Sequence, residues 1–68
     1  MSPTPRQMGQ RIKRLREERG LSQAALAAKA KITREYVNKL EAGRYDPTLG
    51  VVQRLAKALG VSLAELVK

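Results

Sequence analysis

The sequence predicts an all-α fold of about five short helices and no sheet. Apolar residues recur three or four positions apart through most of the chain, which is the spacing of one buried helix face. Ser, Thr, Gly and Pro stand between these periodic segments, where they start and stop helices. No stretch alternates Val, Ile and Thr with polar residues, as a half-buried strand would. The 68 residues suffice for one small domain, predicted over residues 7–68 after a flexible arm of residues 1–6.

The predicted arm and the first helix are set by prolines and by helical spacing. Pro3 and Pro5 favour an extended chain before Arg6. The first helix is predicted over residues 7–19, and Gly20 stands just past its end, where glycine commonly stops a helix. Its predicted buried face consists of Met8, Ile12 and Leu15.

Two short helices joined by a tight turn follow. Ser22 is placed to cap the first of them, predicted over residues 23–29, and Thr33 to cap the second, predicted over residues 34–42. Ala27 provides the small residue that two steeply crossing helices need where their backbones approach. The predicted buried face of the second helix of this pair consists of Val37 and Leu40.

The last third of the chain predicts a loop and two further helices. Pro47 and Thr48 are suited to opening a helix over residues 49–59. The segment Ser62-Leu-Ala-Glu65 has the capping-box pattern that starts a short fifth helix. The residues expected to be buried on the fourth helix are Leu49, Val52, Leu55, Ala56 and Leu59.

Composition limits the possible functions. Fourteen Lys and Arg against six Asp and Glu leave a net charge of +8, which attracts polyanions. A well-solvated basic protein is the alternative, and a membrane surface is the weaker rival because no segment joins a basic face to Trp or Phe anchors. The absence of Cys and His removes the usual zinc ligands, the commonest general base and the thiol nucleophile. We therefore expect no enzyme, no metal and no cofactor.

Location follows from the same sequence features. No apolar run approaches the roughly 20 residues that cross a bilayer, and the first residues do not have the pattern of a signal peptide. The expected protein is cytoplasmic, with no membrane partner and no evident small-molecule ligand.

The third predicted helix has an unusual outer face. Arg34, Glu35, Asn38 and Lys39 face away from its apolar residues. Such side chains match base edges in the major groove of DNA: Lys and Arg pair with guanine, Asn with adenine or a phosphate, and Glu with cytosine. An ordinary helical hairpin in a small bundle is the alternative for a generic sequence. The uninterrupted polar face favours a helix that reads DNA.

A family resemblance supports this interpretation. Leu21-Ser-Gln-Ala-Ala-Leu-Ala, together with Ile32-Thr-Arg-Glu-Tyr-Val-Asn-Lys-Leu-Glu-Ala-Gly43, resembles the lambda repressor/Cro-like helix-turn-helix family, also called the xenobiotic-response-element type. Downstream, Pro47-Thr-Leu and Leu55-Ala-Lys-Ala-Leu-Gly-Val-Ser-Leu63 resemble the fourth helix of that family and the start of its fifth. The likeness covers about residues 7–67 and implies a compact five-helix DNA-binding domain.

The resemblance also implies roles for individual residues. Base contacts fall on positions of the third helix: Thr33, Arg34, Glu35, Tyr36 and Lys39. Phosphate contacts fall on the start of the second helix, on the flank of the third and on the following loop: Gln23, Asn38, Gly43, Arg44 and Tyr45. Arg16 and Glu41 match an ion pair that joins the first helix to the end of the third.

Three positions leave alternatives open. Lys31 stands where the family often has glycine, so it must accept a left-handed conformation or a different turn. Glu35 is unusual beside phosphates, and either reads cytosine or orients Arg34 or Lys39. Tyr36 either contacts the groove or packs on the second helix.

These observations predict a sequence-specific regulator of transcription, most simply a repressor that binds double-stranded DNA. One such helix covers few base pairs, so a homodimer on a palindromic operator is expected. The expected dimer contacts lie in the fifth helix and its lead-in, namely Val61, Leu63, Leu66 and Val67. The alternative function is a protein-interaction module, an antitoxin or adaptor with secondary DNA binding.

Overall fold

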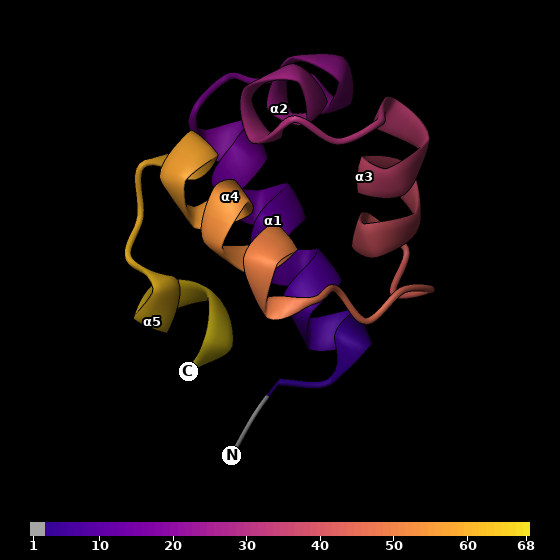
Figure 1. Ribbon diagram of the computed structural model, residues 1–68, viewed down its shortest axis with the longest axis vertical. Coiled ribbons are helices and arrows are strands. Elements are labelled where there is room, and N and C mark those ends of the chain that lie inside the picture. Colours follow the sequence, from indigo (N-terminus) through magenta and orange to yellow (C-terminus); the bar gives the residue numbers. More distant parts are fainter. Residues whose placement is uncertain (1–2) are drawn as a thin grey trace.

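The computed structural model describes residues 3–68, which form five helices (Figure 1). In chain order they are α1 (Pro5–Glu18), α2 (Gln23–Ala30), α3 (Arg34–Glu41), α4 (Leu49–Leu59) and α5 (Leu63–Val67). Residues 3–68 contain no strand, so the predicted all-helical fold of five helices is confirmed. Within this described range, every helix is too short or too polar to cross a bilayer.

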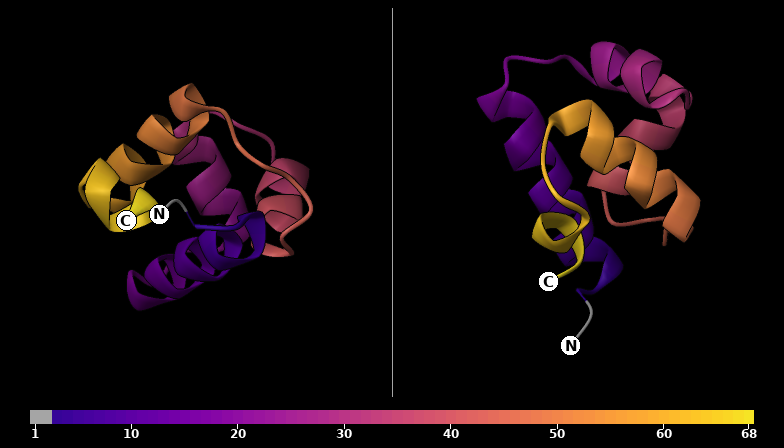
Figure 2. Two further views of the ribbon diagram at one scale, coloured as in Figure 1. Left: turned by 90° about the horizontal axis from the view of Figure 1, so that it is seen from below. Right: turned by 60° about the vertical axis from the view of Figure 1, so that its left-hand side comes forward.

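The helices pack around one core, and the described residues extend 29 × 23 × 21 Å along their principal axes. In Figure 1, α4 crosses in front of α1, α2 lies across the top and α3 stands at the right-hand edge. The short α5 returns to lie beside the first half of α1, as the right-hand view of Figure 2 shows. This arrangement leaves α3 packed on α1 and α2 through one face only.

Each helix begins at a hydroxyl side chain. Every one of these caps accepts a hydrogen bond from the backbone N–H three residues ahead, which satisfies a donor that the helix leaves free. Four of them are predicted from the sequence, and the remaining one opens α1. The five caps are Thr4, Ser22, Thr33, Thr48 and Ser62.

The start of α1 corrects the predicted arm. The Thr4 hydroxyl accepts from the Gln7 N–H, and the Gln7 side chain accepts from the Thr4 N–H, which forms a capping box. Pro5 occupies the first helical position, where its missing N–H costs nothing. The helix therefore begins two residues earlier than predicted and includes Arg6, while residues 1 and 2 of the predicted arm lie outside the described residues.

The core confirms most of the predicted apolar faces. Its completely buried large side chains come from all five helices: Ile12, Leu26, Val37, Leu40, Leu55, Leu59 and Leu66. Leu49 is the exception: the sequence predicts that it is buried, whereas it is 62% exposed. It begins α4 at the edge of the apolar stripe, where no neighbouring element covers it, and Val51 is buried instead.

A glycine lets α1 approach the end of α3. A Cβ atom on Gly9 would lie 2.9 Å from the carbonyl oxygen of Glu41 and closer still to that of Leu40. Only a residue without a side chain permits this backbone contact, because real Cβ atoms do not come so near. Gly9, which sequence reasoning overlooked, thus sets how closely α3 is seated.

Candidate nucleic-acid interface

Helix α3 is amphipathic, with one apolar face and one polar face. Val37 and Leu40 are at most 1% exposed and hold the helix on the core. On the other side Thr33, Arg34, Glu35 and Asn38 are all exposed. The polar face is therefore turned outward, as the sequence predicts, and is not covered by any of residues 3–68.

The turn that aims α3 is closed by a left-handed lysine. Lys31 has φ 58° and ψ 44°, so it adopts the conformation expected of the family's glycine. The N–H of Ile32 donates to the carbonyl oxygen of Ala27 at 3.0 Å, which ties the turn back onto α2. Of the two alternatives for Lys31, the strained left-handed one is present.

An ion pair ties α1 to the end of α3. Arg16 and Glu41 make two parallel hydrogen bonds, Nε to Oε2 at 2.7 Å and Nη2 to Oε1 at 3.0 Å. The remaining terminal nitrogen of Arg16 donates to the carbonyl oxygen of Leu21 at 2.8 Å. The side chains are only 11% and 4% exposed. This is the pair that the family resemblance implies, in bidentate geometry.

The hydrogen bond to Glu41 raises the pKa of the Arg16 guanidinium above its ordinary value, against a smaller opposing effect of burial. A raised arginine pKa adds stability that is lost only as the pH rises through that higher value. Arg16 is therefore charged at neutral pH, and we call its pair with Glu41 the clamp between α1 and α3.

The clamp extends to the proposed phosphate-contacting residues. The amide nitrogen of Gln23 donates to Oε1 of Glu41 at 3.1 Å, and the amide nitrogen of Asn38 lies 3.4 Å from Oε1 of Gln23. Gln23, at the start of α2, thus contacts both Glu41 and Asn38 of α3. We call Arg16, Glu41, Gln23 and Asn38 the polar network.

A second cluster joins α3 to the loop that follows it. The Lys39 ammonium lies 3.3 Å from the Tyr45 hydroxyl and 5.4 Å from the centre of its ring. The rings of Tyr36 and Tyr45 have their centroids 5.3 Å apart at an interplanar angle of 53°. Tyr36 thus packs against the loop, which the sequence does not predict, and Tyr45 is brought beside the residues predicted to contact bases.

The predicted contact residues form one surface around a shallow hollow. Its lining comes from the start of α2 and from α3, and consists of Gln23, Arg34, Glu35, Asn38 and Lys39. Arg44 is exposed on the adjoining loop, and Gly43 is half-buried there. A Cβ on Gly43 would lie 3.0 Å from the Cα of Arg6, so the start of α1 lies beside this loop. Arg6 is a basic residue of this surface that sequence reasoning assigns to the arm.

The predicted dimer contacts are only partly available. Leu66 is completely buried in the core of its own chain, so its prediction as a contact residue is wrong. Leu63 and Val67 of the same helix, and Val61 before it, also pack against the core. Val61, Leu63 and Val67 are half-buried and keep some exposed surface.

Nothing among residues 3–68 groups three His, Cys, Asp or Glu side chains as a metal site would.

Comparison with known proteins decides the family. Residues 12–66 match the family model described as Helix-turn-helix (HTH_3). The chain belongs to this helix-turn-helix family. The predicted lambda repressor/Cro-like resemblance is thereby confirmed over most of the sequence.

Individual relatives agree with this assignment. The immunity repressor protein of Bacillus phage phi105 is 43% identical over 60 residues, which cover 88% of this chain and 42% of that protein. The restriction-modification controller protein C.AhdI of Aeromonas hydrophila has a similar structure, with a TM-score of 0.89 and 37% identity over 91% of this chain and 94% of that one. The chain thus spans less than half of the phage repressor but nearly all of the controller protein.

One similar structure contains DNA. The P22 c2 repressor, in complex with a synthetic operator, matches with a TM-score of 0.84 and 30% identity over 90% of this chain and 92% of that one. A helix-turn-helix protein of this shape is therefore known to bind operator DNA.

Proposed function

We propose that this helix-turn-helix protein is a sequence-specific regulator of transcription that binds double-stranded DNA, most simply as a repressor. One observation supports the proposal above all: the outer face of α3 is polar, exposed and seated on a rigid core by Val37 and Leu40. Helices of this kind enter the major groove with their first residues against base edges. The relatives named as repressors and controllers support the same function.

Base contacts are assigned to the exposed first turn of α3. Thr33, Arg34 and Glu35 lie there together, and a bidentate arginine contact to guanine is the commonest specific pairing. Lys39 and Tyr36 extend the same face toward the loop. Glu35 has no side-chain hydrogen bond or ion pair among the described residues, which favours a contact with cytosine over a role in orienting its neighbours.

Phosphate contacts are assigned to the rim of this face. Gln23 stands at the start of α2, whose free N–H groups favour an anion, and the polar network fixes its amide. Asn38 lies beside Gln23, and Gly43, Arg44 and Tyr45 follow α3 on the loop. Contacts from both sides would hold the register of α3 along the duplex.

A homodimer on a palindromic operator completes the proposal. A single α3 spans too few base pairs for useful selectivity, whereas two copies about one helical turn apart, roughly 34 Å, double the recognised sequence. The exposed parts of Val61, Leu63 and Val67 are the proposed contacts. Sedimentation with and without DNA tests this part separately, and a monomer in both conditions at high concentration contradicts it.

The alternative function, a protein-interaction module such as an antitoxin or adaptor, has no comparable support in the described residues. Large exposed apolar side chains are limited there to Tyr45 and Leu49. We propose no catalytic activity, and location in the cytoplasm stays a prediction from the sequence.

The decisive experiment is selection of bound duplexes from a random DNA pool at several salt concentrations. A specific protein should keep its preferred sequences as salt rises, because only the phosphate contacts are lost with counterion release. Arg34→Ala should change the preferred sequence at a cost of about 1–3 kcal/mol for the affected base pair. Gln23→Ala should weaken all sequences alike.

Arg14→Ala is the matched control, since Arg14 is an exposed cation on α1 that lines a separate hollow with Gln7, Gln10 and Arg11. It should alter neither the preferred sequence nor its rank among others. A pool in which no sequence is enriched, or an Arg34→Ala protein with unchanged preference, would refute the proposal.

A further inference from the structure

A second basic hollow lies between α2 and α4. It measures about 360 Å³ and is lined by the end of α2, the following turn and the outer face of α4. Its lining residues are Lys29, Ala30, Lys31, Arg54, Lys57 and Ala58. None of these lines the hollow on α3, so the two are separate features. We call this one the α2–α4 hollow.

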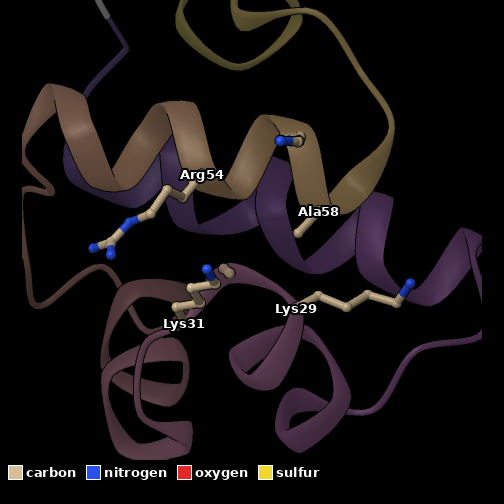
Figure 3. A pocket seen from close by; sticks show the side chains of 6 residues that line it. Lys29, Lys31, Arg54 and Ala58 are labelled. Atoms are coloured by element: carbon tan, nitrogen blue, oxygen red, sulfur yellow. The ribbon is translucent and has the colours of Figure 1, made fainter.

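Four cations line this hollow, from the end of α2, the turn and α4. In Figure 3 the side chain of Lys31 rises from the turn into the gap below α4, while those of Arg54 and Lys29 extend toward opposite ends of it. The two ion pairs among residues 3–68 are Arg16 with Glu41 and Arg19 with Glu18, so neither uses a cation of this hollow. No Asp or Glu lines it.

This arrangement gathers positive charge over the hollow. Like charges held near one another repel, and here the fold fixes the Cα positions of all four. The carbonyl end of α2 compensates Lys29 and Lys31 in part. Arg54 and Lys57 stand in the middle and last turns of α4 and take part in no ion pair, so an anion in the hollow would meet no competing carboxylate.

The lining indicates the chemical class of the missing anion. Only Ala30 and Ala58 are apolar, whereas protein partners are usually held by aromatic or large apolar anchors. The volume falls at the lower end of the range for small-molecule sites, roughly 300–1,000 Å³. Arginine and lysine together are the usual partners of phosphate groups. A small anion with several negative charges fits best.

We propose that the α2–α4 hollow binds an oligophosphate, either free or as the phosphate chain of a nucleotide. The guanidinium of Arg54 and the ammonium groups of Lys29, Lys31 and Lys57 would each take phosphate oxygens. This site does not depend on the DNA-binding function proposed for α3, since it shares no lining residue with that surface.

Titration calorimetry and amide NMR with tripolyphosphate test the proposal at 0.15 M salt, where charges beyond about 8 Å are screened. Binding should shift the backbone amides of residues 29–31 and 54–58 and leave residues 34–39 little changed. The double variant Arg54→Gln/Lys57→Gln should bind roughly tenfold or more weakly, because two charge-assisted contacts are removed. Both side chains are exposed, so the variant should fold normally.

Lys13→Gln/Arg14→Gln is the matched control, because it removes the same two charges from exposed positions on α1. It should change the affinity less than about twofold, as expected for distant screened charges. ATP and adenosine distinguish a free oligophosphate from a nucleotide. If ATP binds with the same affinity as tripolyphosphate, the protein recognises the phosphates alone. If ATP binds more tightly, the ligand is a nucleotide. Equal losses in both double variants, shifts centred on α3, or binding of adenosine would overturn the proposal.

Discussion

Helices α3 and α4 are both short, both amphipathic and both basic on the outside, yet their outer faces differ in one respect. On α3, Asn38 and Lys39 have side-chain partners, in the polar network and at Tyr45 respectively. On α4, Arg54 and Lys57 make no side-chain hydrogen bond or ion pair with any of residues 3–68. The α3 face is therefore held in place at Asn38 and Lys39, whereas Arg34 and Glu35 in its first turn make no side-chain hydrogen bond or ion pair with residues 3–68, like the two cations of α4.

This difference has a functional meaning. Side chains held before binding lose less rotamer freedom when a ligand arrives, and they enforce its geometry. Free cations attract any anion within reach but specify little. The α3 face thus suits the recognition of a base sequence, whereas the α2–α4 hollow suits the binding of a small anion with several negative charges. Four substitutions test or sharpen this contrast.

The largest effect is expected from Glu41→Ala, which removes the centre of the polar network. It leaves Arg16 nearly buried without its partner, at a cost of about 3–5 kcal/mol in unfolding free energy. Chemical denaturation measures this loss, and selection from a DNA pool should show weakened sequence preference. Tripolyphosphate binding by the folded fraction should persist. Glu17→Ala, an exposed carboxylate on α1, is the control and should leave stability nearly unchanged.

The next effect is expected from Gly9→Ala, which forces α1 away from the end of α3. The added Cβ meets backbone carbonyls that cannot rotate aside, so we expect a loss of about 1–3 kcal/mol or more. Gly50→Ala is the paired change on α4, where a Cβ has only the Thr48 hydroxyl at 4.0 Å. It should gain about 0.5–1 kcal/mol. Thermal denaturation giving the same sign for both would contradict the assigned role of Gly9.

A smaller gain is expected from Lys31→Gly. The left-handed conformation costs a non-glycine residue about 1–2 kcal/mol, which glycine avoids. Glycine also gains conformational freedom in the unfolded chain, and this offsets part of the stabilisation. A net stabilisation of up to about 1 kcal/mol should appear in urea denaturation, with DNA preference unchanged. Tripolyphosphate binding should weaken, since one of the four cations is lost. A destabilised variant would show that the Lys31 side chain contributes contacts beyond the turn.

The smallest effect is expected from Leu49→Ala. Although Leu49 is apolar and in register with the core of α4, its side chain is 62% exposed, so stability should change by no more than about 0.5 kcal/mol. Leu55→Ala on the same helix should cost about 2–5 kcal/mol, because that side chain is completely buried. Equal losses at the two positions in denaturant titrations would show that Leu49 is covered in solution.

Local interactions explain why so much of the fold was predictable. Ser22, Thr33, Thr48 and Ser62 each accept from an N–H three residues away, so a few letters of sequence suffice to place a helix start. The start of α1 was misplaced because Pro5 suits both an extended arm and a first helical turn. The outward residues of α3 followed from the spacing of Val37 and Leu40 alone.

The remaining features depend on residues far apart in the chain. Arg11 donates to the carbonyl oxygen of Leu66 at 3.0 Å, 55 residues away, and Arg19 donates to that of Leu59. The Arg11 hydrogen bond thereby holds α5 against α1. The packing of Tyr36 on Tyr45 is similarly invisible to helical periodicity.

By itself the sequence determined the helices, their caps, the inward and outward sides of α3 and the sign of the charge, because each depends on neighbours within about one helical turn. Only the tertiary structure decided the close seating of α3 at Gly9, the exposure of Leu49 and the gathering of four cations between α2 and α4. Those outcomes depend on which helix surfaces meet, and spacing along one helix carries no information about the element that will cover it.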